Sequence, residues 1–294
     1  MGLGTVQALA AVVIWGGSFA STKHLLGDLS ATTLLFARTV LGMLSVVVLL
    51  AARGPRLRVL PAHTWPRLAA LSLLGMVTTQ LLQAWALAVS GSAKTAWLIA
   101  VNPVVTAAMA VVLLGETLRG KVLGLTVAFI GVLLVSGEGR PLADLMALPS
   151  TRGDLLTLLS TLTFAFYTVF GRQQAIEGDP PIVALHIIGF AALGYFPGFL
   201  LSGGLAQLAR LSGPEWLALA YLGAGCSGIA FFLYYLALEH LEASRAASFI
   251  YVEPLIAQAV GVLVMGEALS PVVLAGGAAI IAGIYLVSRS AAPA

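Results

Sequence analysis

Two ionisable side chains lie inside long apolar stretches of the sequence, where a charge is expected to have either an oppositely charged partner or a functional role. Arg38 falls within residues 31–52 and Glu253 within residues 245–265. Charged groups in hydrocarbon are costly and mark substrate or proton pathways, so Arg38 could hold a substrate carboxylate or serve a gate, and Glu253 could carry a proton. The alternative is one buried pair that locks two helices. At ~1.5 Å per residue in a ~30 Å core, their depths differ by only ~8 Å.

A helical wheel favours the structural alternative for Glu253. At ~100° per residue, Ser248, Tyr251 and Gln258 fall on one side of their helix, and Glu253 points about 160° from Tyr251. The side that carries Glu253 is rich in small apolar residues, which suit close helix packing. We therefore predict that Ser248, Tyr251 and Gln258 line a substrate cavity and that Glu253 packs between helices.

Uncharged polar and aromatic side chains complete the predicted cavity. Amides and hydroxyls can bond the carboxylate and ammonium of a zwitterion, and aromatic faces can hold a side chain or a cation. Besides Arg38 and the face just described, the predicted lining residues are Trp15, Ser18, Thr79, Gln80, Gln83, Trp97 and Tyr234. The alternative for each aromatic residue is core packing or anchoring at a membrane interface.

Glycines and prolines interrupt the stretches that carry these side chains. Pro103 and Pro254 fall in the middle of apolar segments, where a proline frees a backbone carbonyl and kinks the helix. Gly16 and Gly17 directly follow Trp15. We predict that these four residues form substrate-facing breaks or hinges.

The elements that position these residues are membrane helices. The chain has 294 residues, of which 60% are hydrophobic and 9% charged, and its mean hydropathy is +1.01. Its formal net charge of +3 is spread over short loops, so a nucleic-acid partner is not expected. Stretches long enough to cross a bilayer as helices occur at residues 4–22, 31–52, 68–90, 94–114, 120–137, 154–172, 181–202, 215–238, 245–265 and 271–288.

The ten segments form two halves with a common plan. Residues 86–118 and 237–269 align without a gap and are identical at eleven positions. We predict a first five-helix repeat in residues 1–137, a connecting loop in 138–153 and a second repeat in 154–294. Because five is an odd number, the second repeat is expected to be inverted in the membrane, an organisation typical of secondary transporters.

Lysine and arginine counts predict the orientation. Loops on one side carry nine basic residues and loops on the other carry five. The positive-inside rule places both termini in the cytoplasm, and we expect a multi-pass protein of a bacterial inner membrane.

Several motifs resemble the EamA family of the drug/metabolite transporter superfamily, over nearly the whole chain. They are Trp15-Gly16-Gly17-Ser18-Phe19, Arg38, Pro103, Gly115-Glu116, Gly124 and Gly131, with the echoes Glu253-Pro254, Gly266-Glu267, Gly276 and Gly283. In detail the chain is most similar to amino-acid exporters of the YddG type. The resemblance implies an exporter of neutral or aromatic amino acids or similar small metabolites, working by alternating access. One departure from symmetry is Asn102, which stands where the second half has Glu253.

Other function classes find less support. Gly223 to Gly228 spell a dinucleotide-binding fingerprint, but no strand precedes them, so we interpret these glycines as helix packing. We expect no enzymatic activity, no cofactor and no metal, and we interpret His186 as a core or cavity histidine. The alternatives left open are an exporter of drugs or other metabolites, a membrane enzyme acting on lipid-linked substrates and a scaffold that transports nothing.

Two further features are interpreted as structural. Glu116 and Glu267 each end one helix just before the next begins, where a carboxylate stabilises a helix N-terminus. The fifth and tenth helices carry small residues at i, i+4 spacing, which indicates a packing face or a homodimer interface outside the pathway.

Overall fold

In a computed structural model of the chain, the described residues are 2–52, 60–89, 95, 98–137, 152–256, 259 and 270–290, and every element within them is a helix. Seven helical stretches are long and apolar enough to cross a membrane: Leu3–Leu25, Ala31–Ala52, Ala62–Val89, Arg152–Glu177, Pro180–Leu201, Gly213–His240 and Pro271–Arg289. Two shorter apolar helices, Asn102–Leu114 and Lys121–Val135, accompany them. The predicted all-α membrane fold is confirmed.

Several of these stretches consist of consecutive helices. The first half contains α1 (Leu3–Gly16), α2 (Ser18–Leu25), α3 (Ala31–Ala52), η1 (Ala62–Thr64), α4 (Trp65–Ala70), the π-helix η2 (Leu71–Val77), α5 (Thr78–Val89), α7 (Asn102–Leu114) and α8 (Lys121–Gly137). The second half contains α10 (Arg152–Glu177), α11 (Pro180–Leu201), α12 (Gly204–Leu208), α13 (Gly213–Ala220), the π-helix η3 (Tyr221–Ala230), α14 (Phe231–His240), α15 (Ala243–Ser248), the 3-10 helix η4 (Phe249–Val252) and α17 (Pro271–Ser290).

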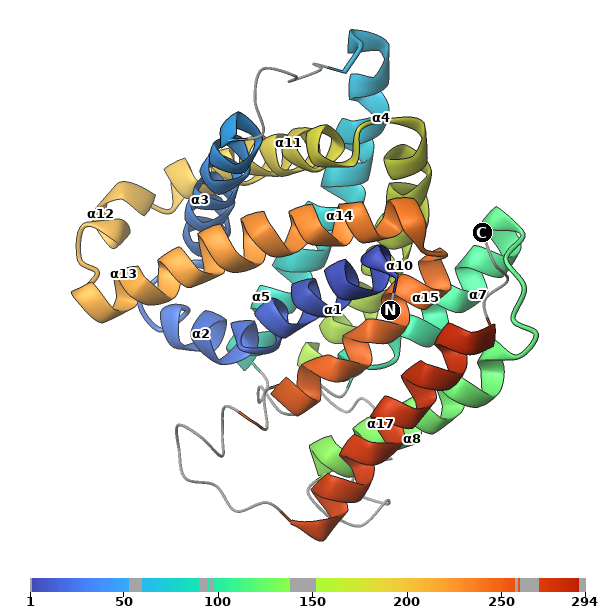
Figure 1. Cartoon of the computed structure of the whole chain (residues 1–294). Helices are drawn as coiled ribbons and strands as arrows, with labels where there is room; N and C mark the ends of the chain where they lie inside the picture. Colours follow the sequence, from blue (N-terminus) through green and yellow to red (C-terminus); the bar gives the residue numbers. More distant parts are fainter. Residues whose placement is uncertain are drawn as a thin grey trace.

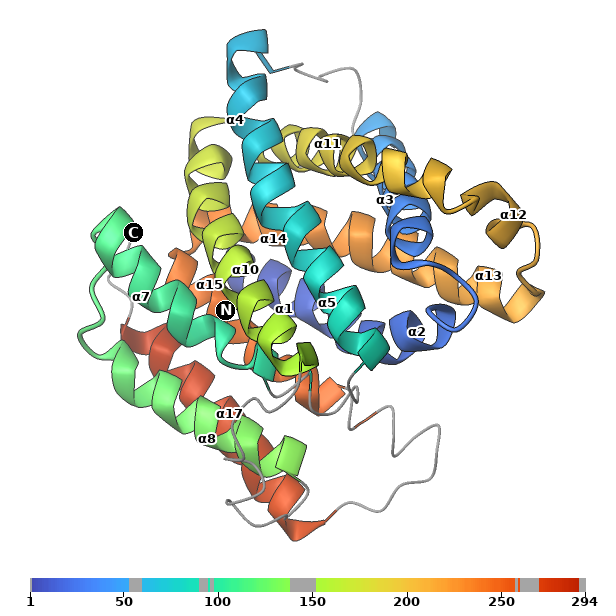
Figure 2. The same cartoon turned by 180° about the vertical axis from the view of Figure 1, so that it is seen from behind.

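The helix contacts between the two halves occur in pairs, and the members of each pair are related by exchanging one half for the other. Helix α1 of the first half packs against α14 of the second, and the equivalent pair with the halves exchanged, α10 against α5, also packs together. Likewise α3 contacts η3, and η2 contacts α11. Equivalent helices also meet each other, as α8 does α17, α3 does α11 and α7 does α15. Figures 1 and 2 show α8 and α17 side by side at the edge of the molecule.

The α8–α17 contact is closed by glycines and runs antiparallel. A Cβ atom built on Gly124 would lie 2.6 Å from the carbonyl oxygen of Gly283, and one on Gly131 would lie 2.6 Å from that of Gly276. The low-numbered end of α8 therefore lies beside the high-numbered end of α17. The glycines predicted to pack therefore do so between two helices of one chain, where the absence of a Cβ atom lets the helix backbones approach closely.

The predicted breaks are present, but both prolines sit at helix beginnings rather than in helix interiors. Helix α7 begins at Asn102, so Pro103 lies in its first turn, where the missing N–H costs no hydrogen bond. Pro254 is the second residue after η4, in the first turn of the helical stretch that begins at Glu253. In the first span the break falls between α1 and α2 at Gly17, with Gly16 packed against Ile256. A hinge function for these residues stays a prediction.

Candidate functional site

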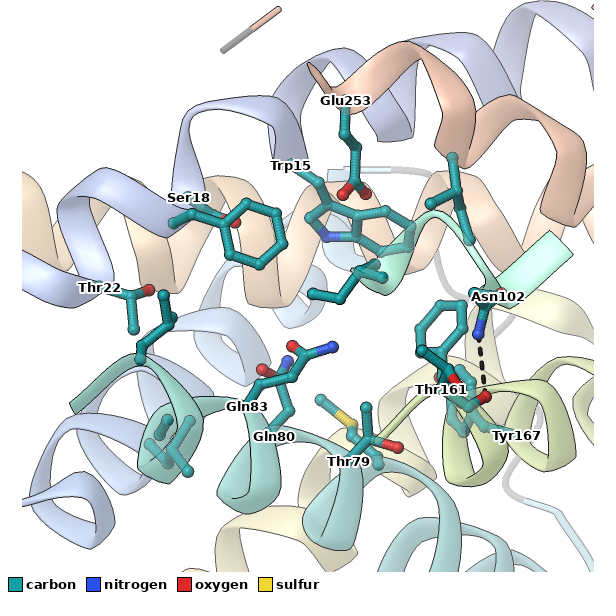
Figure 3. A pocket seen from close by; sticks show the side chains of 18 of the residues that line it. Trp15, Ser18, Thr22, Thr79, Gln80, Gln83, Asn102, Thr161, Tyr167 and Glu253 are labelled. Atoms are coloured by element: carbon teal, nitrogen blue, oxygen red, sulfur yellow. Dashed lines mark hydrogen bonds between the residues drawn. The ribbon is translucent and has the colours of Figure 1, made fainter. Parts of the chain in front are cut away.

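A pocket lies between the two halves (Figure 3). Both halves line it, the first through α1, α2, α3, η2, α5 and α7, and the second through α10, α14, η4 and Glu253. The lining residues are Trp15, Ser18, Phe19, Thr22, Leu35, Arg38, Met76, Thr79, Gln80, Gln83, Ala84, Leu87, Ile99, Asn102, Thr161, Phe164, Tyr167, Phe231, Ile250 and Glu253.

The structure brings some of the predicted lining residues together and places others elsewhere. Those at the pocket are Trp15, Ser18, Arg38, Thr79, Gln80 and Gln83. The residues Tyr234, Ser248 and Tyr251 are fully buried and do not line it. Tyr234 lies behind Trp15, with ring centroids 5.2 Å apart, and the Ser248 hydroxyl donates to the Arg245 carbonyl oxygen at 2.7 Å. Trp97 and Gln258 lie outside the described residues.

The predicted orientation of Glu253 and Tyr251 is wrong. Glu253 lines the pocket, and Figure 3 shows its carboxylate directed into it beside Trp15. Tyr251 instead packs in the apolar cluster that joins α8 and α17, with Ala128 and Ile280. The wheel assumed a continuous α-helix, but residues Phe249–Val252 form a 3-10 turn. This turn changes the angle between Tyr251 and Glu253 by only about 40°, so the two side chains still lie on different sides of the helix, and the prediction failed because it took the polar side as the one that faces the pocket.

Arg38 reaches the pocket from α3 and is anchored from behind by η3. Its Nε donates to the Ser227 hydroxyl at 2.8 Å, and the residue is 4% exposed. The glycines that spell the dinucleotide fingerprint make this approach possible, since Gly223 packs on Leu41 and Gly228 on Gly42. Their interpretation as packing residues agrees with these contacts. Helix η3 is a π-helix, an irregularity often found at functional sites.

The Trp15 indole forms one wall of the pocket and has little freedom. Its Nε1 donates to the Cys226 carbonyl oxygen at 2.9 Å. Its ring lies 5.0 Å from that of Phe231 and 6.3 Å from that of Phe164, both in edge-on geometry. An aromatic side chain held on several sides offers a ligand a surface of defined position.

Asn102 lines the pocket from the start of α7. Its Nδ2 donates to the Thr161 carbonyl oxygen at 3.1 Å, as Figure 3 shows, and its Oδ1 accepts from the Thr106 hydroxyl at 3.2 Å. Nearby, Thr79 and Thr163 share a hydrogen bond of 2.6 Å. Asn102 was not among the predicted lining residues. The repeat alignment contained the signal, because Asn102 is the counterpart of Glu253.

A cluster of buried charges ties the halves together at another end of the molecule. Lys121, at the start of α8, is fully buried, and its Nζ lies 2.7 Å from Glu242 and 3.6 Å from Glu116. Glu116 accepts from the backbone N–H groups of Ala243 and Ser244 and from the Ser244 hydroxyl.

Glu116 therefore stabilises a helix N-terminus as predicted, but the helix is α15 of the other half rather than the next helix along the chain. Arg245, in the same short helix, donates to the Thr5 hydroxyl at 3.3 Å, which adds a second link to the first half. Among the described lining residues of the pocket, none comes from residues 3–14, 103–121 or 240–248. The charge cluster and the pocket are thus separate features. Glu267 lies outside the described residues.

These features define a multi-pass helical membrane protein with a pocket between its two halves, and comparison with known proteins gives its family. The model of the EamA-like transporter family matches residues 2–137 and 151–289. The chain belongs to this family. Membership identifies it as a membrane transporter of small metabolites.

Some relatives match over most of their length. An uncharacterized transporter of Archaeoglobus fulgidus is 27% identical over 276 residues, which cover 94% of this chain and 93% of the relative. A probable terminal-alkyne amino-acid exporter of Streptantibioticus cattleyicolor is 25% identical over 282 residues, with 95% and 91% covered. A protein of known crystal structure shares the fold, with a TM-score of 0.79 at 21% identity over 98% of this chain and 99% of that one.

Proposed function

We propose that the protein is a secondary transporter that exports neutral amino acids, aromatic ones in particular, or similar small metabolites by alternating access. In this proposal it lies in the inner membrane of a bacterium with both termini in the cytoplasm, and it catalyses no chemical reaction. Its two repeats are inverted with respect to each other in the membrane.

The observation that carries the proposal is the position of the pocket between two halves whose equivalent helices run antiparallel. Helices α8 and α17 are equivalent in the repeat and meet head to tail through their glycines. Helices α3 and α11 are also equivalent and antiparallel, since Phe36 stacks on Phe199 with ring centroids 4.4 Å apart while Met43 lies near Gly189. A pocket at the interface of two inverted halves can be opened to either side of the membrane when one half rocks against the other.

The pocket composition supports an amino-acid substrate. Aromatic side chains, namely Trp15, Phe19, Phe164, Tyr167 and Phe231, offer an apolar surface for a bulky side chain. Hydroxyls and amides, together with Arg38 and Glu253, offer partners for a carboxylate and an ammonium. The exporter of a terminal-alkyne amino acid among the relatives points to the same chemical class.

The positions of the lining residues support a state closed toward the cytoplasm. On the predicted orientation, the Lys121 cluster lies at the cytoplasmic end, where Glu116 and Arg245 join the halves. The lining of the pocket instead extends along α2 to Thr22 and along α5 to Leu87, which are toward the outer face. A homodimer through the outer faces of α8 and α17 stays a prediction. The proposed function does not require it, because one chain already contains a complete pocket.

Counterflow in liposomes tests the proposal. Purified full-length protein is reconstituted, liposomes are loaded with one unlabelled amino acid, and uptake of labelled amino acids is measured with and without a pH gradient. We expect aromatic and other bulky neutral amino acids to exchange faster than charged ones. Exchange of drugs or unrelated metabolites without any amino-acid exchange would move the protein to the alternative substrate class, and no exchange of any solute would contradict the transport function.

A further inference from the structure

We propose that Arg38 and Glu253 form a two-point recognition site for a zwitterion, in which Arg38 binds the substrate carboxylate and Glu253 binds its primary ammonium. This inference rests on the proposed function and names the groups of the substrate that the pocket reads. It replaces the packing role that the sequence predicted for Glu253.

The Arg38 guanidinium is prepared for an anion. Its Nε is occupied by Ser227, which holds the plane of the group and leaves its remaining N–H donors for a ligand. No carboxylate of a described residue forms an ion pair with Arg38, although the residue is 4% exposed. A carboxylate is the natural partner, because its two oxygens match the fork of a guanidinium.

The Glu253 carboxylate is in turn prepared for a cation. The residue is 9% exposed, its carboxylate points into the pocket, and no hydrogen bond or ion pair joins it to another described residue. An ionised carboxylate only accepts hydrogen bonds, and a primary ammonium offers three donors. The Trp15 indole, which lines the same pocket, can add a cation–π contact to an ammonium bound there.

The two charges are the only ones among the described lining residues, and they have opposite signs. An amine without a carboxylate leaves Arg38 without an anion, and an acid without an amine leaves Glu253 without a cation. A zwitterion satisfies both groups at once, and the pocket with its ligand is then electrically neutral. Because Arg38 belongs to the first half and Glu253 to the second, the bound substrate also connects the halves that must move.

The repeat counterpart of Glu253 shows that the pocket holds one ammonium site rather than two. Asn102 occupies the equivalent position, and its amide is bonded to Thr161 and Thr106. It carries no charge, and one of its two N–H donors and one lone pair of its oxygen are already engaged. The pocket therefore favours a substrate with a single ammonium over a diamine.

A binding experiment with three probes built on one carbon skeleton tests the assignment. Phenylalanine carries both charges, 2-phenylethylamine only the ammonium, and 3-phenylpropionate only the carboxylate. Leucine, isoamylamine and 4-methylpentanoate form a second set with an aliphatic side chain. Each probe competes with a labelled amino acid for the purified full-length protein. We expect both truncated probes of each set to bind at least about tenfold more weakly than the amino acid, because each leaves one buried charge unpaired.

Two neutral variants separate the charges. Glu253→Gln is expected to weaken amino-acid binding at least about tenfold while leaving 3-phenylpropionate unchanged or tighter. Arg38→Gln should weaken the amino acid and spare 2-phenylethylamine. Glu253→Asn, which installs the residue of the first half, is a second test at this position, and Arg38→Lys retains charge should Arg38→Gln fail to fold. Arg119→Gln, at an exposed residue, is the matched control and should bind all probes as the wild type does.

Each remaining outcome has a defined meaning. If the variants keep the wild-type ranking of zwitterion, amine and acid, the two-point site is wrong although amino-acid transport stands. If Glu253→Gln keeps that ranking and loses only uptake driven by a pH gradient, Glu253 is a proton carrier and the inference is overturned. If folded wild-type protein binds no amino acid of either set or of the counterflow panel, the proposed substrate class fails and the inference fails with it.

Discussion

Two groups of buried charges in the described part of the chain differ completely in their bonding. Lys121 is enclosed by Glu116 and Glu242, and Glu116 also accepts hydrogen bonds from the start of α15. Arg38 and Glu253 are buried as deeply, yet no described residue pairs with the charge of either. A buried charge that has its partners inside the fold serves the fold. A buried charge that lacks one and faces a pocket is available to a ligand.

The energetics of burial give this comparison its force. Removing one partner of a buried ion pair is costly because the remaining charge is left uncompensated. Neutralising a buried charge that has no partner tends to stabilise the folded state, since folding no longer has to desolvate that charge. Neutral substitutions at the two groups should therefore change stability by very different amounts.

The largest loss of stability is expected for Lys121→Met. The substitution leaves the Glu116 and Glu242 carboxylates facing each other without a cation. The free energy of unfolding should fall by about 3–5 kcal/mol, as for other broken buried pairs. Unfolding of the detergent-solubilised protein, followed by heating and by denaturant, measures the change, with Arg119→Gln as the exposed control nearby. Unfolding at the wild-type midpoint would show that the cluster does not hold the halves together.

A smaller loss is expected for Glu116→Gln. The amide oxygen can still accept from the N–H groups of α15, but its charge toward Lys121 is gone and Glu242 alone remains to pair with the cation. We expect a decrease of about 1–3 kcal/mol, the range for a weakened hydrogen bond to a charged group. The same unfolding measurement applies. A loss as large as that of Lys121→Met would mean that Glu242 contributes little.

A loss of about 1 kcal/mol is expected for Asn102→Ala, the neutral counterpart at the pocket. The substitution removes the bond to the Thr161 carbonyl oxygen and the one from Thr106. Val104→Ala, at an exposed position of the same helix, is the matched control. An unchanged midpoint for Asn102→Ala would indicate that water replaces both bonds.

The smallest effect on stability, with the opposite sign to the others, is expected for Glu253→Gln. Neutralising a charge without a partner should leave the unfolding midpoint unchanged or raise it, while amino-acid binding falls. The two readouts are made on one preparation. A destabilisation as large as that of Lys121→Met would place Glu253 in the same structural category and remove the contrast between the two charge groups.

Much of the candidate site was predictable from residue types. Arg38, Gln80 and Gln83 are polar groups in apolar helices, which hydrocarbon does not tolerate without a reason, and all three line the pocket. The repeat alignment pairs Asn102 with Glu253, and both line the same pocket although neither was predicted to do so. The direction of Glu253 was mispredicted because the side of the helix that carries Tyr251 was taken as the cavity side, whereas Tyr251 packs in the cluster that joins α8 and α17.

By itself, the sequence determined the class of the protein, its helical spans and its division into two related halves. These properties follow from the length and hydropathy of each segment and from the alignment of the chain with itself, which need no knowledge of distant contacts. Only the tertiary structure decided which buried charges are paired, because Glu116 and Lys121 find their partners more than a hundred residues away in the other half. A local pattern sets which residues are buried, but the packing of one half against the other decides what each of them meets.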